Sequence, residues 1–242
     1  MTRFENALEK AKSNIAFDGG IGTLSEKTLH SVLKYYIEPC DDFHEVAYCG
    51  FVADIMRDGC ITEIQTRGFD RLRKKLAAFL PNSPVTVVFP IAENRYYTTV
   101  DTKSGEATKE RKSPRRGNVY DAFKELYKIK TFLGDENLYF HFILLDVTEI
   151  RHTVKKSWKN RRGIELFERI PRTINKEIYI DGKEDFKKLI PSELHEPFYS
   201  RDFAKAIKRT KGEAITALNV LTHVGAVKRI GRDKNGYLYE RN

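Results

Sequence analysis

The sequence predicts an α/β protein in which a mixed sheet is flanked by helices and followed by a small tail of two helices and a hairpin. Three observations support this class. Two short strands joined by Asp58-Gly59 cover residues 51–66. Continuous apolar runs at 85–89 and 138–147 are typical of strands covered on both faces. Apolar stripes at helical spacing separate these runs, so helices and strands alternate along the chain.

Composition favours a polyanionic partner. The 242 residues carry 43 Lys and Arg against 34 Asp and Glu, a net charge of +9, and the pI is near 9.3. This balance predicts nucleic acid, or less readily a membrane surface. Three cysteines without CxxC spacing, no apolar leader and no long apolar run predict a cytoplasmic protein without a membrane span. We expect domains at 1–150 and 191–242, joined by a basic connector at 151–190.

The N-terminal part predicts two helices. A short helix is expected at 5–12, followed by a glycine-rich loop. Thr23-Leu24-Ser25-Glu26 is typical of a capping box, and an apolar stripe then runs to the residues before Pro39. Glu26 therefore has two competing roles, as a helix cap or as a catalytic acid.

The turn at Asp58-Gly59 fixes the pairing of the strands at 51–66, because a type I′ turn needs positive φ at both central residues. In this register Asp54 lies opposite Glu63, and Gln65 shares their face. Two opposed carboxylates repel each other. A divalent cation with oxygen ligands would relieve the repulsion; the alternative is a pair of solvated charges on an edge hairpin.

Basic residues follow on two segments. A helix with an apolar stripe from Phe69 to Leu80 carries cations on its other faces, among them Arg71 and Lys74. These form a solvated face or hold a nucleic-acid backbone. After a strand at 85–89 and a further strand at 96–100, the segment 103–117 is a basic loop or hairpin tip that is either disordered or in contact with phosphates. Its candidate contacts are Arg111, Lys112, Arg115 and Arg116.

The second half begins with a helix at 119–132 and a strand at 138–147. Residues 151–163 are basic and hold the only tryptophan, Trp158. An aromatic among cations stacks on a base or anchors a linker on the core, and we favour the anchor. Residues 164–189 predict a connector of mixed helix and strand.

The tail predicts a helix from Arg201 to Arg209 capped by Ser200, then a helix at 213–223 stopped by Gly225. Strands at 227–229 and 237–239 follow. The expected core face of the second helix is Ala214, Ile215, Leu218, Leu221 and Val224. This order resembles a winged helix-turn-helix, which implies a helix in a DNA groove and a hairpin on the backbone. The resemblance assigns DNA contacts to Lys211, Thr216, Asn219, Arg232 and Lys234.

Residues 20–100 resemble the core of the PD-(D/E)xK, or restriction-endonuclease-like, nuclease superfamily. The resemblance rests on the order helix, strand, strand, strand, helix, strand, with Asp54 on one strand and Glu63-Ile64-Gln65 on the next. Gln65 replaces the usual lysine, as in some restriction endonucleases of the superfamily, and a glutamine supplies no cation. The whole chain is also similar to uncharacterised bacterial proteins that share the runs LSEKTLHSVLKYY, EIQTRGF and RKSPRRG.

The superfamily resemblance implies a DNA endonuclease that uses Mg²⁺ or Mn²⁺. Asp54, Glu63 and the Ile64 carbonyl would hold the metal, Gln65 would orient the water, and Glu26 would assist. A homodimer would suit double-strand cleavage. One alternative is an inactive nuclease-like protein that binds DNA as a regulator or adaptor. A structural RNA binder ranks last, because the common single-strand stacking motifs are absent from the sequence.

Overall fold

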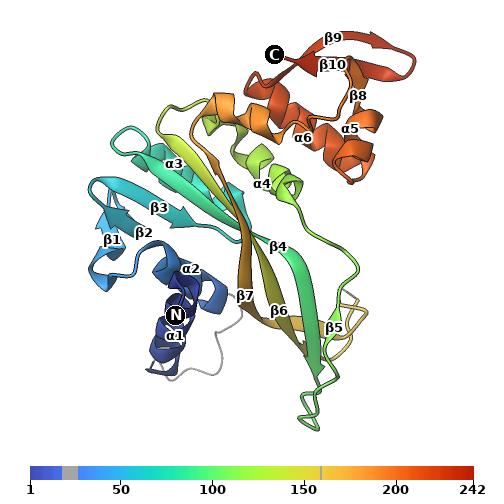
Figure 1. Ribbon diagram of the computed structural model, residues 1–242. Helices are drawn as coiled ribbons and strands as arrows, with labels where there is room; N and C mark the ends of the chain where they lie inside the picture. Colours follow the sequence, from blue (N-terminus) through green and yellow to red (C-terminus); the bar gives the residue numbers. More distant parts are fainter. Residues whose placement is uncertain (18–26, 159) are drawn as a thin grey trace. The chain divides into compact units, whose positions relative to one another are not determined.

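The structure is a computed structural model that describes residues 1–17, 27–158 and 160–242 (Figure 1). The helices are α1 (Arg3–Phe17), α2 (Lys27–Ile37), α3 (Arg73–Phe79), α4 (Phe123–Leu126), α5 (Ser200–Ala206) and α6 (Lys211–His223). The strands are β1 (His44–Tyr48), β2 (Phe51–Arg57), β3 (Cys60–Ile64), β4 (Val85–Val100), β5 (Arg111–Lys112), β6 (Leu138–Thr153), β7 (Ile164–Ile180), β8 (Phe198–Tyr199), β9 (Val227–Asp233) and β10 (Gly236–Arg241).

A mixed sheet has the strand order β1-β2-β3-β4-β6-β7, with β5 paired to β4. β2 and β3 are antiparallel, whereas β3 and β4 are parallel because α3 forms the connection between them. The predicted α/β class with a mixed sheet flanked by helices is confirmed. A second small sheet has the order β8-β10-β9.

The hairpin at 51–64 forms as the sequence predicts. Met56 pairs with Ile61 and Arg57 with Cys60. Asp58 and Gly59 have φ angles of 50° and 78°, the positive values that a type I′ turn requires. The order α2, β1, β2, β3, α3, β4 is also the predicted one. The predicted capping box at Thr23–Glu26 lies outside the described residues.

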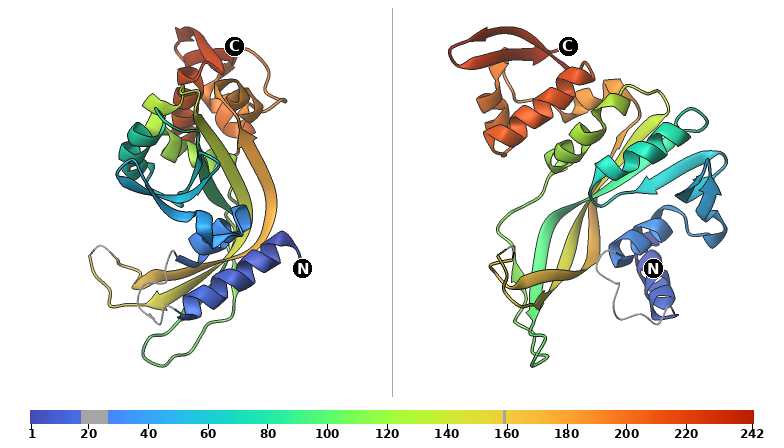
Figure 2. Two further views of the ribbon diagram at one scale, coloured as in Figure 1. Left: turned by 90° about the vertical axis from the view of Figure 1, so that its left-hand side faces the viewer. Right: turned by 180° about the vertical axis from the view of Figure 1, so that it is seen from behind.

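The chain divides into two compact units, each built from separate segments. Unit 1 comprises 1–46, 90–118 and 143–177, and unit 2 comprises 47–89, 119–142 and 178–242. In unit 1, α1 and α2 lie side by side (Figure 2) and bury Ala7, Ala11 and Val32 between them. In unit 2, Phe79, Phe140 and Phe142 are among the fully buried side chains. The predicted ranges 1–150, 151–190 and 191–242 stay predictions.

Two central segments differ in detail from the prediction. The strands expected at 85–89 and 96–100 are one continuous strand, β4, and the basic segment 103–117 returns along it as β5, where Tyr96 pairs with Lys112. The helix expected at 119–132 is three short pieces, with α4 between 3₁₀ helices at 119–122 and 127–132. Ile129 has non-helical angles inside the last piece, so the apolar stripe is buried without one continuous helix.

The tail contains the predicted helices and hairpin, with two corrections. Ser200 is the first residue of α5 and does not cap it; the Tyr199 N–H donates to Asp202 Oδ2 at 2.9 Å instead. Ile215 is 47 % exposed and does not belong to the core face of α6, where Ala217 and Val220 are buried. Local spacing identified the helix but not its exact buried side, because helix α6 is covered on more than one face.

Trp158 does not anchor a linker on the core, since 81 % of its surface is exposed. It lies at the turn between β6 and β7, where the sequence predicted a connector. In the part of the chain that the structure describes, no helix is long and apolar enough to cross a membrane.

Candidate functional site

Glu63 is a buried carboxylate in unit 2. Its strand, β3, lies between β2 and β4, and only 1 % of the residue is exposed. Lys75 from α3 reaches it: Lys75 Nζ lies 3.0 Å from Oε1 and 2.8 Å from Oε2 of Glu63. A buried carboxylate needs such a partner, because an unpaired charge in the interior is very costly.

Asp54 completes the cluster from the neighbouring strand. Its Oδ2 accepts a hydrogen bond from the Ile64 N–H at 2.7 Å, so the side chain turns toward β3. Burial, and next the negative charge of Asp54, raise the pKa of Glu63 to about 7, while the hydrogen bond from Lys75 opposes the rise. The opposition of two carboxylates expected from the hairpin register is therefore present and is balanced by a lysine.

Gln65, another predicted catalytic residue, is held by hydrogen bonds outside this cluster. The Gln65 side-chain amide donates to the Arg67 carbonyl, and its backbone N–H donates to the Val88 carbonyl at 2.9 Å. Gln65 is thus held by the loop after β3 and by β4. Glu26 lies outside the described residues. The group that the structure brings together consists of Asp54, Glu63 and Lys75.

Lys75 is a site residue that sequence reasoning missed. It lies on the helix at which the sequence predicts cations on a solvated or nucleic-acid-binding face. Its position in the helix indicates the buried face, because Lys75 lies three residues after Leu72 and four before Phe79, both of which are buried. A lysine inside the apolar stripe of a helix points toward the core and needs a buried anion there.

The oxygen ligands of this cluster are few. Among residues 1–17, 27–158 and 160–242, no group of three or more His, Cys, Asp or Glu side chains is arranged to hold a metal ion. Asp54 and Glu63 are the two carboxylates of the cluster, and Lys75 contacts both oxygens of Glu63. Mg²⁺ is commonly bound through one or two carboxylates and keeps several waters, so two carboxylates are the donors that this cluster could offer to it.

Residues 27–181 match the model of a family described as a domain of unknown function, DUF8091. The chain belongs to this family. An uncharacterized protein of Treponema pallidum (strain Nichols) is 30 % identical over 169 residues, which cover 69 % of this chain and 64 % of the relative. The chain thus spans less than two thirds of that relative's length. No solved structure matches the chain.

The DUF8091 match contains Asp54, Glu63 and Lys75 and ends before α5. The predicted DNA contacts Arg71 and Lys74 are exposed within it, in unit 2. The other four, Arg111, Lys112, Arg115 and Arg116, are exposed in unit 1. In unit 1, Arg116 binds Glu93 at 2.7 Å, and Lys112 Nζ lies 5.5 Å from the centre of the Tyr96 ring.

The tail of this DUF8091 protein presents most of its predicted contacts to solvent. Lys211, Arg232 and Lys234 are exposed, and Thr216 Oγ1 donates to the Gly212 carbonyl of the same helix at 3.1 Å. Asn219 is less accessible, because its Oδ1 accepts a hydrogen bond from Lys130 at 3.0 Å. The side chain therefore helps to join α6 to the 3₁₀ helix at 127–132.

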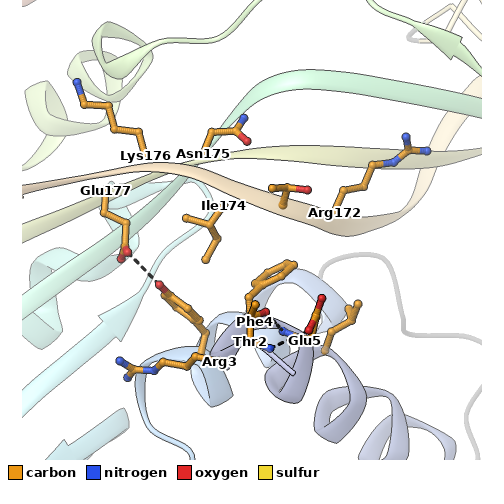
Figure 3. Close-up of a pocket in the computed structure, with 12 residues that line it drawn as sticks. Thr2, Arg3, Phe4, Glu5, Arg172, Ile174, Asn175, Lys176 and Glu177 are labelled. Carbon is orange, nitrogen blue, oxygen red and sulfur yellow. Dashed lines mark hydrogen bonds between the residues drawn. The ribbon is translucent and has the colours of Figure 1, made fainter.

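Unit 1 also has an open cavity of about 620 Å³ between α1 and β7 (Figure 3). Phe4, Tyr36 and Ile174 give it apolar walls, and the Tyr36 hydroxyl donates to Glu177 at 2.9 Å. None of the predicted site residues lines it. The cavity therefore adds nothing to the carboxylate–lysine cluster.

Proposed function

We propose that this protein is a metal-dependent DNA nuclease of the PD-(D/E)xK type. The observation that carries the proposal is the buried Glu63, placed between Asp54 and Lys75 on β2, β3 and α3. A buried ion pair beside a second carboxylate contributes little to stability, because desolvation offsets its attraction. Strongly perturbed carboxylates of this kind are typical of functional sites.

Lys75 supplies the cation that the motif lacks at Gln65. Superfamily members usually carry this lysine two residues after the glutamate, on the same strand. Here the ammonium group arrives from α3 and meets the same carboxylate. In this proposal Lys75 stabilises negative charge at the phosphate and takes the role of the lysine that superfamily members usually have at the position of Gln65.

Asp54, Glu63 and the Ile64 carbonyl would hold Mg²⁺ or Mn²⁺. When bound, the metal supplies an activated water and stabilises the leaving oxygen. The pKa of Glu63 near 7 means that its carboxylate gains full charge only as the pH rises through neutrality. Lys75 must release at least one Glu63 oxygen before that oxygen becomes a ligand, since it contacts both.

The tail extends the proposal to DNA binding. α5, α6 and the β9–β10 hairpin follow the order of a winged helix-turn-helix (Figure 1). In that reading Lys211 and Thr216 enter a groove, and Arg232 and Lys234 on the hairpin meet the phosphates. The net charge of +9 supports a polyanionic partner, and a cytoplasmic location and dimerisation belong to the same proposal.

The decisive experiment is a cleavage assay with plasmid, linear duplex and single-stranded DNA, with and without Mg²⁺ or Mn²⁺. We expect cleavage that requires metal and that falls at least about 100-fold in Asp54→Asn, Glu63→Gln and Lys75→Met, because each removes a charge from the reacting centre. Lys124→Ala is the control, because this exposed lysine of α4 is not among the predicted DNA contacts, and the variant should keep activity. Wild-type protein that cleaves none of these substrates would refute the nuclease.

A second candidate is an inactive nuclease-like protein that binds DNA as a regulator. The observation that favours it is the ion pair itself, since Lys75 occupies both oxygens of Glu63. In this case wild type cleaves nothing, binds DNA without metal, and binds it more tightly after Asp54→Asn, because a negative charge facing phosphates is removed.

A further inference from the structure

Trp158 is the most exposed large apolar side chain inside the described chain, apart from the terminal Met1. Its exposed fraction is 81 %, compared with 51 % for Tyr179 and 48 % for Tyr127. It is also the only tryptophan of the protein. Tryptophan combines a large apolar ring with a polar N–H, and for this reason it is enriched at binding interfaces.

Hydrogen bonds connect the described residues on both sides of Trp158. The Ser157 N–H donates to the Asn160 carbonyl at 3.1 Å, and the Asn160 N–H donates to Ser157 Oγ at 3.0 Å. The Asn160 side chain accepts from the Gly163 N–H and donates to the Ile164 carbonyl. Gly163 has φ +63°, and a Cβ there would lie 2.9 Å from the Val154 carbonyl oxygen, so this position requires glycine.

The same turn is strongly basic. Lys155, Lys156, Arg161 and Arg162 are all exposed around Trp158, and residues 154–163 include no acidic residue. A cationic surface with an aromatic at its centre offers two complementary contacts to a nucleic acid: charge for the phosphates and a flat face for a base.

Further aromatic and cationic groups of unit 1 lie on the strands next to the turn. His152 and Phe167 stack with ring centres 4.1 Å apart and an angle of 15° between their planes. The Arg151 guanidinium lies 4.3 Å from the centre of the Tyr97 ring. The strands that lead to the turn thus carry further aromatic and cationic side chains, and each of these rings already has one face covered by its neighbour.

We propose that Trp158 and its exposed neighbours Lys155, Lys156, Arg161 and Arg162 bind single-stranded nucleic acid, with Trp158 stacked on an unpaired base and the four cations holding phosphates. In a duplex the base faces are covered by their neighbours, so an indole reaches them only in a single strand. The inference rests on the proposed function, because it names the form of nucleic acid that the nuclease would receive.

The test uses the intrinsic fluorescence of Trp158, which reports on this turn alone. The full-length protein is titrated in EDTA with oligothymidylate and with a duplex of equal length. We expect quenching by the single strand and little change with the duplex. Trp158→Ala should weaken binding of the single strand at least about 5-fold, Trp158→Phe should retain most of it, and the control Tyr127→Ala should leave it unchanged.

Charge gives a second readout. Replacing Arg161 and Arg162 with alanine should lower the slope of log K against log salt by about 1.4, since each phosphate contact on a single strand contributes about 0.7. An unquenched Trp158, an unchanged affinity in Trp158→Ala, or a blue shift with anionic phospholipid vesicles but not with oligonucleotide would overturn the proposal.

Failure here is distinct from failure of the nuclease, because the measurement uses neither metal nor cleavage. Quenching by a protein that cuts nothing would support the single-strand surface and remove the enzyme. Metal-dependent cleavage by a protein whose Trp158 fluorescence does not change with oligonucleotide would support the enzyme and remove the single-strand surface.

Discussion

At the scale of single residues, Glu63 sets a measurable pH dependence. Burial and the charge of Asp54 raise its pKa in the folded protein to about 7, from the ordinary glutamate value of 4.5. Between these values the folded state binds a proton that the unfolded chain has released. The free energy of unfolding therefore falls as pH rises from about 4.5 to about 7, and the loss is complete above 7.

Glu63→Gln removes this titration while keeping the shape of the side chain. In EDTA we expect the variant to melt at a higher temperature than wild type above pH 7, and the difference to disappear below pH 4.5. Thermal unfolding followed by circular dichroism at pH 4, 6 and 8 checks this. A constant difference across these pH values would mean that Glu63 does not titrate in this range.

The same residues show how far sequence reasoning reaches at this scale. The Asp58-Gly59 turn fixes a local register, so the opposition of Asp54 and Glu63 followed from the sequence. The sequence did not identify the partner of Glu63, because Lys75 lies on a different element, α3. Distance along the chain does not distinguish Lys75 from the residues beside it, Lys74 and Leu76. Only the helical spacing of Lys75 between buried residues distinguishes it.

At the scale of elements, strands with a continuous apolar run were predictable because burial on both faces leaves a local signature. The interruptions of the helix at 119–132 were not predictable, since three short helical pieces can bury the same apolar stripe as one continuous helix. The backbone angles at Ile129 are non-helical inside the last piece. Helices α5 and α6 also begin earlier than predicted, at Ser200 and Lys211, because their N-caps are Tyr199 and Thr210. Element ends depend on hydrogen bonds that the apolar pattern does not encode.

The hairpin turn offers a test at this scale. Gly59 has φ +78°, and a Cβ added there would meet nothing within 4 Å. Gly59→Ala should therefore destabilise the protein by about 1 kcal/mol through backbone strain alone. Gly212→Ala is the control, because this position lies in α6 without positive φ and with equally open surroundings, and it should be neutral or stabilising. Urea unfolding at constant m-value measures both.

At the scale of the whole molecule, the basic residues assigned to DNA fall in both compact units. The two units interleave along the chain, because β4, β6 and β7 each contribute residues to both of them. The role of the tail is therefore tested by point substitutions and not by truncation.

Truncation after residue 190 would remove more than charge. Arg209 binds Asp121 through two contacts of 2.9 Å, and α6 packs against α4, so unit 2 would lose part of its core. The variant Lys211→Ala, Arg232→Ala, Lys234→Ala removes three exposed cations and leaves these contacts intact. We expect weaker duplex binding, with the slope of log K against log salt reduced by about 2.7, because each phosphate contact on duplex DNA contributes about 0.9. Anisotropy titrations at several salt concentrations measure it. Lys187→Ala, a single exposed lysine outside the predicted contacts, is the control. If the triple variant has the same salt slope as wild type, the tail serves packing or a protein partner and not DNA.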